Sequence, residues 1–199
     1  PTTGGIFIIL AIIISSIITL LMAEKMDNTA WIILITLFFM TLAGFQDDYL
    51  KIKGCQNKGL SPKGKLLRQI LIALIPTLYA MQTYGTVLVV GSKSFDIGLL
   101  FPILAVFVVT GASNAYNLTD GLDGLAGGLS AIAFLAFGLL AWNASWMQGS
   151  QEVGIFCFVL VGTLLGFLVF NTHPAKVFMG DTGSLALGGA LAATAILTK

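Results

Sequence analysis

Long stretches without a charged residue are the feature that most restricts how this chain can fold. Seven of them run along the sequence, at 4–23, 29–45, 69–90, 97–116, 125–147, 153–170 and 182–198. Each has about 17–23 residues, which as a helix crosses about 30 Å of hydrocarbon. Backbone polar groups in a bilayer need partners within their own segment, so these runs must be helical. The sequence predicts an all-α, polytopic membrane protein with about seven transmembrane helices.

Composition supports this fold class. The chain has 199 residues, of which 57% are hydrophobic and 10% are charged, whereas soluble domains carry about 25% charged residues. No internal repeat or linker divides the chain, so we expect one transmembrane domain over residues 1–199. It begins at Pro1 without a methionine and stops just after an apolar run, so we expect truncation at both ends. Two cysteines indicate neither a disulfide framework nor a zinc site.

Basic residues define the orientation of the spans. Segments 46–68, 117–124 and 171–181 share one side and hold most of the lysines and the arginine. Segments 24–28, 91–96 and 148–152 share the other and hold only Lys25 and Lys93. By the positive-inside rule the first side is cytoplasmic. The side that holds most of the basic residues is therefore expected to face the cytoplasm.

Acidic residues gather on the same face. Its three segments contain five aspartates, all at or just beyond the end of a span: Asp47, Asp48, Asp120, Asp123 and Asp181. The predicted topology alone brings these carboxylates to one membrane face and one depth. Adjacent carboxylates at an interface need water or a cation. Asp47-Asp48 is thus either a solvated helix end or a site for a metal ion or a general base.

Two further motifs carry polar groups to this face. Asp120-Gly121-Leu122-Asp123-Gly124 is a tight turn or a ligand loop in which glycine allows close backbone approach. Asp181 precedes a span whose N-terminal N–H groups suit a phosphate, and an N-cap role is compatible with that. Phe178 is either a packing residue or a platform for a base.

The lysines of segment 59–68 are either topogenic charges that contact anionic lipid or groups that hold a diphosphate. Five aspartates would repel a phosphorylated substrate unless Mg²⁺ and lysines intervened. Their joint presence on one face favours a metal–phosphate site.

Several motifs in order resemble the polyprenyl-phosphate N-acetylhexosamine-1-phosphate transferase superfamily, and within it the phospho-N-acetylmuramoyl-pentapeptide transferase family. They are 1–5 (PTTGG), 47–51 (DDYLK), 59–61 (GLS), 117–126 (NLTDGLDGLA) and 177–184 (VFMGDTGS). The resemblance implies a fold of about ten helices, of which this chain holds about seven. It implies transfer of phospho-MurNAc-pentapeptide from UDP-MurNAc-pentapeptide to undecaprenyl phosphate. The products would be lipid I and UMP, in peptidoglycan biosynthesis.

The resemblance also implies residue roles. By this resemblance, Asp47 would be the base for the lipid phosphate or a residue that positions it. Asp48 would be a second essential acid, and Asp181 the Mg²⁺ ligand. Substrate-binding residues would be Thr2, Lys51, Lys63, Asn117, Asp120, Asp123, Asn171 and Phe178, with Phe178 stacked on uracil. A homodimer in the lipid bilayer is implied too, and we expect no nucleic-acid partner.

Other functions make different demands. A sister transferase that takes UDP-N-acetylglucosamine would use the same chemistry and differ in its donor. A transporter or cation channel needs charged residues in mid-span, whereas the acids here lie at span ends. A purely structural membrane protein gives no reason for five aspartates on one face.

Overall fold

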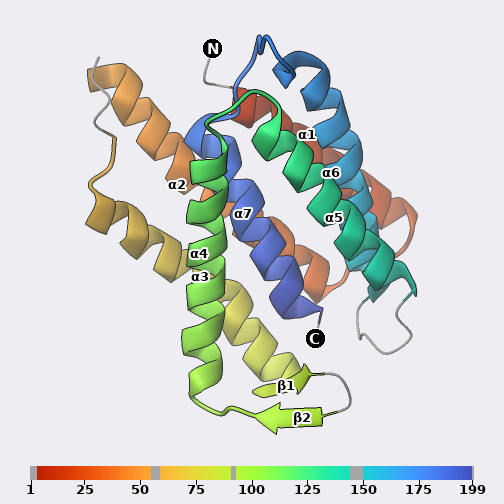
Figure 1. The fold of residues 1–199 in the computed structure, drawn as a ribbon. Coiled ribbons are helices and arrows are strands. Elements are labelled where there is room, and N and C mark those ends of the chain that lie inside the picture. The colour runs from red at the N-terminus through yellow and green to blue at the C-terminus, as the bar shows by residue number, and fades with distance from the viewer. Residues whose placement is uncertain (1–3, 55–58, 91–92, 144–149, 199) are drawn as a thin grey trace.

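The computed structural model describes residues 4–54, 59–90, 93–143 and 150–198. Seven helices and one hairpin make up this part of the chain (Figure 1). The helices are α1 (Gly4–Met22), α2 (Asn28–Gly54), α3 (Pro62–Tyr84), α4 (Leu100–Thr119), α5 (Leu125–Asn143), α6 (Ser150–Asn171) and α7 (Gly180–Leu197). Strands β1 (Val87–Val90) and β2 (Lys93–Asp96) pair antiparallel, with Val87 opposite Asp96 and Val90 opposite Lys93. The all-α prediction is confirmed.

Helices α1 to α6 are long and apolar enough to cross a membrane by length and composition. These helices leave many large apolar side chains exposed, such as Phe7, Phe107 and Val169. Exposed apolar side chains on that scale belong in lipid, because water would penalise them. The chain is therefore a multi-pass membrane protein.

Helix α7 has a different environment from the other six. It lies at the centre of the helices, beside both α2 and α4 (Figure 1), and most of its residues are buried. Small residues permit this close packing. A Cβ added to Gly188 would lie 2.8 Å from the Cα atom of Ser113 in α4. The predicted seventh span is thus a helix, but it packs against protein on nearly all sides and falls outside the group of membrane-crossing candidates among the described residues.

Two helix boundaries differ from the predicted spans in ways that matter for the site. Helix α2 continues past Phe45 to Gly54, so Asp47, Asp48 and Lys51 are helical. Helix α3 begins at Pro62, earlier than the uncharged stretch 69–90. The Ser61 hydroxyl accepts a hydrogen bond from the Gly64 N–H (3.2 Å) and caps it. The lysines expected in a loop therefore project from a helix.

The predicted C-terminal end of the span 69–90 was wrong, because the helix ends six residues earlier. Helix α3 stops at Tyr84, because Gly85 adopts a φ of +72° that ends the helical path. The valines that follow form β1, in keeping with the strand preference of β-branched side chains.

Candidate active site

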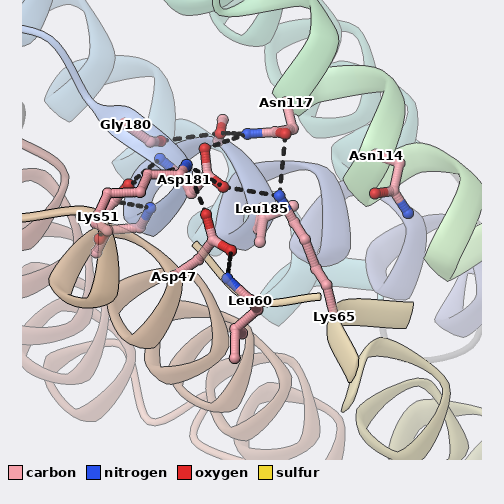
Figure 2. Close-up of polar contacts among 12 residues, drawn as sticks. Asp47, Lys51, Leu60, Lys65, Asn114, Asn117, Gly180, Asp181 and Leu185 are labelled. Atoms are coloured by element: carbon pink, nitrogen blue, oxygen red, sulfur yellow. Dashed lines mark hydrogen bonds and ion pairs between the residues drawn. The ribbon is translucent and has the colours of Figure 1, made fainter. Parts of the chain in front are cut away.

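The motifs that the sequence predicts on one membrane face meet where the last turns of α2 reach the first turn of α7 (Figure 2). Asp47 has an exposed fraction of 3%. Its Oδ1 accepts a hydrogen bond from the Leu60 N–H (2.7 Å), and its Oδ2 pairs with the Lys51 ammonium one turn along α2. The i, i+4 spacing of Asp47 and Lys51 places both on one helix face.

Asp48 points at the N-terminus of α7. Its carboxylate accepts hydrogen bonds from the Thr182 N–H (2.8 Å), the Thr182 hydroxyl (2.6 Å) and the Asp181 N–H (3.2 Å). These are N–H groups that a helix leaves without internal partners, and the positive end of the helix dipole favours a carboxylate there. Asp48, which lies in α2, therefore caps α7 and fixes the position of Asp181 in the first turn of that helix.

Asp181 is the hub of the cluster. Its Oδ2 contacts the ammonium groups of Lys65 (2.7 Å) and Lys51 (3.0 Å), and its Oδ1 accepts from the Asn117 amide (2.8 Å). Burial raises the pKa of Asp181, but hydrogen bonds from Lys65 and Asn117 and the charge of Lys65 prevail and hold that pKa below its usual range. Asp181 is thus a carboxylate at every physiological pH.

The three acids form a candidate metal site. Oxygen atoms of Asp47, Asp48 and Asp181 lie within 4.8 Å of one another. Carboxylate oxygens are the ligands that hard divalent cations take. Lys51 already places a positive charge between Asp47 and Asp181, so the geometry suits a cation at this point. Asp48 is the least available of the three, because α7 occupies its oxygens.

Two cavities adjoin this cluster and share the side chains of Lys51, Asn117 and Asp181. The first, of about 440 Å³, is also lined by Asp48, Ile52, Asp120, Phe178 and Gly180. The second, of about 640 Å³, lies toward α3 and is also lined by Asp47, Lys65, Gln69 and Asn114. Asp181 can therefore be reached by a ligand in either of the two cavities.

Asp120 and Phe178 distinguish the first cavity. Burial, and then repulsion from Asp181 and Asp48, raise the pKa of Asp120 to about 7. Near neutral pH both its protonated and its ionised forms are therefore populated. A cation bound among these carboxylates would lower its pKa again. Phe178 is 38% exposed and offers an aromatic wall.

Asn171 and Asp123 join two loops beside the first cavity. Asn171 is 2% exposed; its Oδ1 accepts from the Gly124 N–H (3.1 Å) and its Nδ2 donates to the Val177 carbonyl (2.8 Å). Asp123 accepts from the Ala175 N–H (3.0 Å) and lies 3.0 Å from Nδ1 of His173. Hydrogen bonding to Ala175 and to His173 lowers the pKa of Asp123. These contacts hold the segment that carries Phe178.

The predicted site residues thus have different placements. Lys51, Asn117, Asp120 and Phe178 line the first cavity together with Asp48 and Asp181. Asn171 and Asp123 are engaged in the loop contacts just described, and their predicted contact with substrate stays a prediction. Lys63 is exposed on α3. Thr2 lies outside the described residues.

Lys65 is the lysine of segment 59–68 that the sequence motifs did not single out. It donates to Asp181 and also to Asn117 Oδ1 (3.2 Å). A signal for it exists: Lys65, Gln69 and Ala73 recur every four residues, and Gln69 and Ala73 are fully buried. Lys63 lies on a different face. Recognising the Ser61-Pro62 helix start would have extended this stripe back to Lys65.

Comparison with known proteins identifies the family of the chain. The model of the family described as "Glycosyl transferase family 4" matches residues 30–199. Among curated relatives, the phospho-N-acetylmuramoyl-pentapeptide-transferases of Bacillus licheniformis, Oceanobacillus iheyensis and Bacillus subtilis are 51%, 50% and 50% identical to the chain. Each alignment covers 100% of this chain and 61% of the relative, so the chain spans about three fifths of their length. The chain belongs to glycosyl transferase family 4.

Proposed function

We propose that the protein transfers phospho-MurNAc-pentapeptide from UDP-MurNAc-pentapeptide to undecaprenyl phosphate, releasing UMP and forming lipid I. The observation that carries this proposal is the Asp181 hub, which two lysines contact and two cavities share. Such an arrangement suits two phosphorylated substrates that meet at one charged centre. The names of the relatives favour this donor over UDP-N-acetylglucosamine.

The two cavities suggest which substrate binds where. The first, with Phe178 and Asp120, suits the nucleoside part of the donor, since an aromatic wall can stack on uracil. The second adjoins an apolar groove of about 440 Å³ between α3 and α4, and Leu66 and Asn114 line both. A polyprenyl chain in the groove would bring its phosphate to Asp47 and Lys65.

The reaction then follows from these positions. An oxygen of the lipid phosphate attacks the sugar-side phosphorus of the diphosphate, a new P–O bond forms, and the P–O bond to UMP breaks. Asp47 accepts the proton of the lipid phosphate when that proton is present. Lys51 and Lys65 neutralise negative charge that spreads over the phosphoryl oxygens, which is the main task of a protein in phosphoryl transfer.

Mg²⁺ fits the carboxylate cluster, and Asp181 would hold it, with Asp47 beside the ion as the proton acceptor. When bound, Mg²⁺ supplies charge neutralisation and orientation of the diphosphate. Asp48 serves this site by capping α7 and thereby holding Asp181 in place. We further propose one catalytic domain over residues 1–199, a bacterial plasma membrane location with this face in the cytoplasm, and a homodimer.

A donor assay tests the proposed function. The full-length protein in detergent, with Mg²⁺ and undecaprenyl phosphate, is given each UDP-sugar separately and UMP release is followed. We expect release with UDP-MurNAc-pentapeptide and its loss on addition of EDTA. Release with UDP-N-acetylglucosamine alone would instead place the protein with the sister transferases.

Lys65 and Lys63 offer a matched pair of variants. We expect Lys65→Met to lower kcat by about 10²-fold, because one charged donor to the reacting centre is lost. Lys63→Met should change kcat by less than about threefold, as expected for an exposed charge. UMP release by the two variants at saturating donor measures this difference. If Lys63→Met lowers kcat more than Lys65→Met does, Lys63 rather than Lys65 is the lysine that binds phosphate.

Asn171 should affect donor binding rather than chemistry. Asn171→Ala removes the hydrogen bond to the Val177 carbonyl and the one from the Gly124 N–H, which loosens the segment that carries Phe178. We therefore expect KM for UDP-MurNAc-pentapeptide to rise about tenfold with kcat little changed. His173→Ala is the control, because its exposed pair with Asp123 is worth little. A fall in kcat with KM unchanged would show that Asn171 acts on the reacting groups themselves.

A further inference from the structure

A second binding feature lies on the side of α3 away from the two cavities. Helices α2 and α3 form a groove of about 320 Å³. Its walls are apolar and include Phe39, Leu42, Leu71 and Ile72; Phe39, Leu42 and Leu71 are between 40% and 57% exposed. Gln46 and Arg68 line the same groove. The feature combines a lipid-facing apolar channel with one cation.

The guanidinium of Arg68 is held in place by neutral partners. Its Nε donates to the Gln46 Oε1 (3.0 Å) and its Nη1 donates to the Gly64 carbonyl (2.9 Å). The sequence has nine acidic residues, and all nine lie in the described part of the chain. The ion pairs they form there go to Lys51, Lys65 and His173, and none goes to Arg68. The Arg68 guanidinium is therefore fixed in position, has further N–H donors available, and has no acidic partner among the described residues.

The position of Arg68 in the membrane indicates where that anion comes from. Arg68 directly precedes the uncharged stretch that begins at Gln69, and Gln46 directly follows the one that ends at Phe45. Both residues thus lie where hydrocarbon gives way to lipid headgroups. Guanidinium groups bind phosphate through two parallel hydrogen bonds.

We propose that this groove binds an anionic glycerophospholipid, with the lipid phosphate on Arg68 and an acyl chain along the α2–α3 walls. The ligand is a resident membrane lipid rather than a substrate. The inference requires only that the chain lies in a bilayer, so it stands or falls separately from the proposed transferase activity.

Native mass spectrometry of the delipidated full-length protein tests this site. The probes are phosphatidylglycerol and phosphatidylcholine with identical acyl chains. We expect phosphatidylglycerol to bind about tenfold more tightly than phosphatidylcholine, and Arg68→Gln to remove that difference. Lys93→Gln in β2 is the control, since it removes one exposed charge beyond the other end of α3 and should leave the preference unchanged. Thermal melting of each variant verifies its fold.

Leu71→Trp provides an independent variant, because it narrows the groove and keeps Arg68. We expect it also to weaken phosphatidylglycerol binding. The proposal is overturned if the wild-type protein binds both lipids equally, as it would were another segment of the full chain covering the groove. It is also overturned if Arg68→Gln keeps the wild-type preference.

Discussion

Replacing Asp181 with asparagine is expected to lower UMP release by the full-length protein by about 10³-fold or more. Asparagine keeps the size of the side chain but removes the charge that attracts Lys51 and Lys65, which lie 3.0 and 2.7 Å from it. It also removes a carboxylate ligand from the candidate metal site. The fold should survive, since Asp48 caps α7 through the backbone N–H of residue 181 rather than through its side chain.

Asp96→Asn is the matched control for this variant. Asp96 lies on the hairpin that follows the far end of α3, and it is exposed. We expect wild-type UMP release from it. If Asp181→Asn keeps more than a tenth of wild-type activity at saturating Mg²⁺ and donor, Asp181 does not act at the reacting centre.

Gly44→Ala is expected to destabilise the protein by about 1–3 kcal/mol or more and to reduce activity with it. A Cβ at Gly44 would overlap the Asp181 carbonyl oxygen and lie 2.7 Å from the Cα atom of Thr182. Backbone atoms cannot move aside as a flexible side chain can. Helix α7 would therefore shift away from α2 and carry Asp181 from the lysines.

Gly162→Ala in α6 is the control, because a Cβ there meets nothing within 4 Å and alanine favours a helix. Thermal unfolding in detergent and UMP release should be measured for both variants. Equal melting temperatures for the two would contradict the tight α2–α7 contact on which this expectation depends.

The sequence allowed much of the architecture to be predicted, because uncharged runs in a bilayer can only be helices. It also predicted that Asp47, Asp48 and Asp181 share one membrane face, since alternation of the spans requires it. Their approach within 4.8 Å depends on the packing of α7 against α2, and no one-dimensional pattern contains that packing.

Other parts of the site depend on local geometry that composition hides. The choice between Lys63 and Lys65 is decided by the helical face that α3 buries, and so by where α3 begins. The hairpin after Tyr84 was missed because its valines continue the apolar pattern of the span. The inter-helix cap by Asp48 and the loop contacts of Asn171 are tertiary hydrogen bonds, which a motif alone does not indicate.

The central position of α7 has a consequence for biogenesis. Asp48 and Thr182 are 134 residues apart, so α2 enters the membrane long before the helix that Asp48 caps has been synthesised. Helix α7 carries an acid in its first turn and many small residues, which makes it a poor candidate for autonomous insertion. We expect α7 to enter the membrane only after the earlier helices have formed a protein-lined space that receives it. The candidate active site is therefore completed only when α7 packs against α2, and until then the newly made chain has no assembled site.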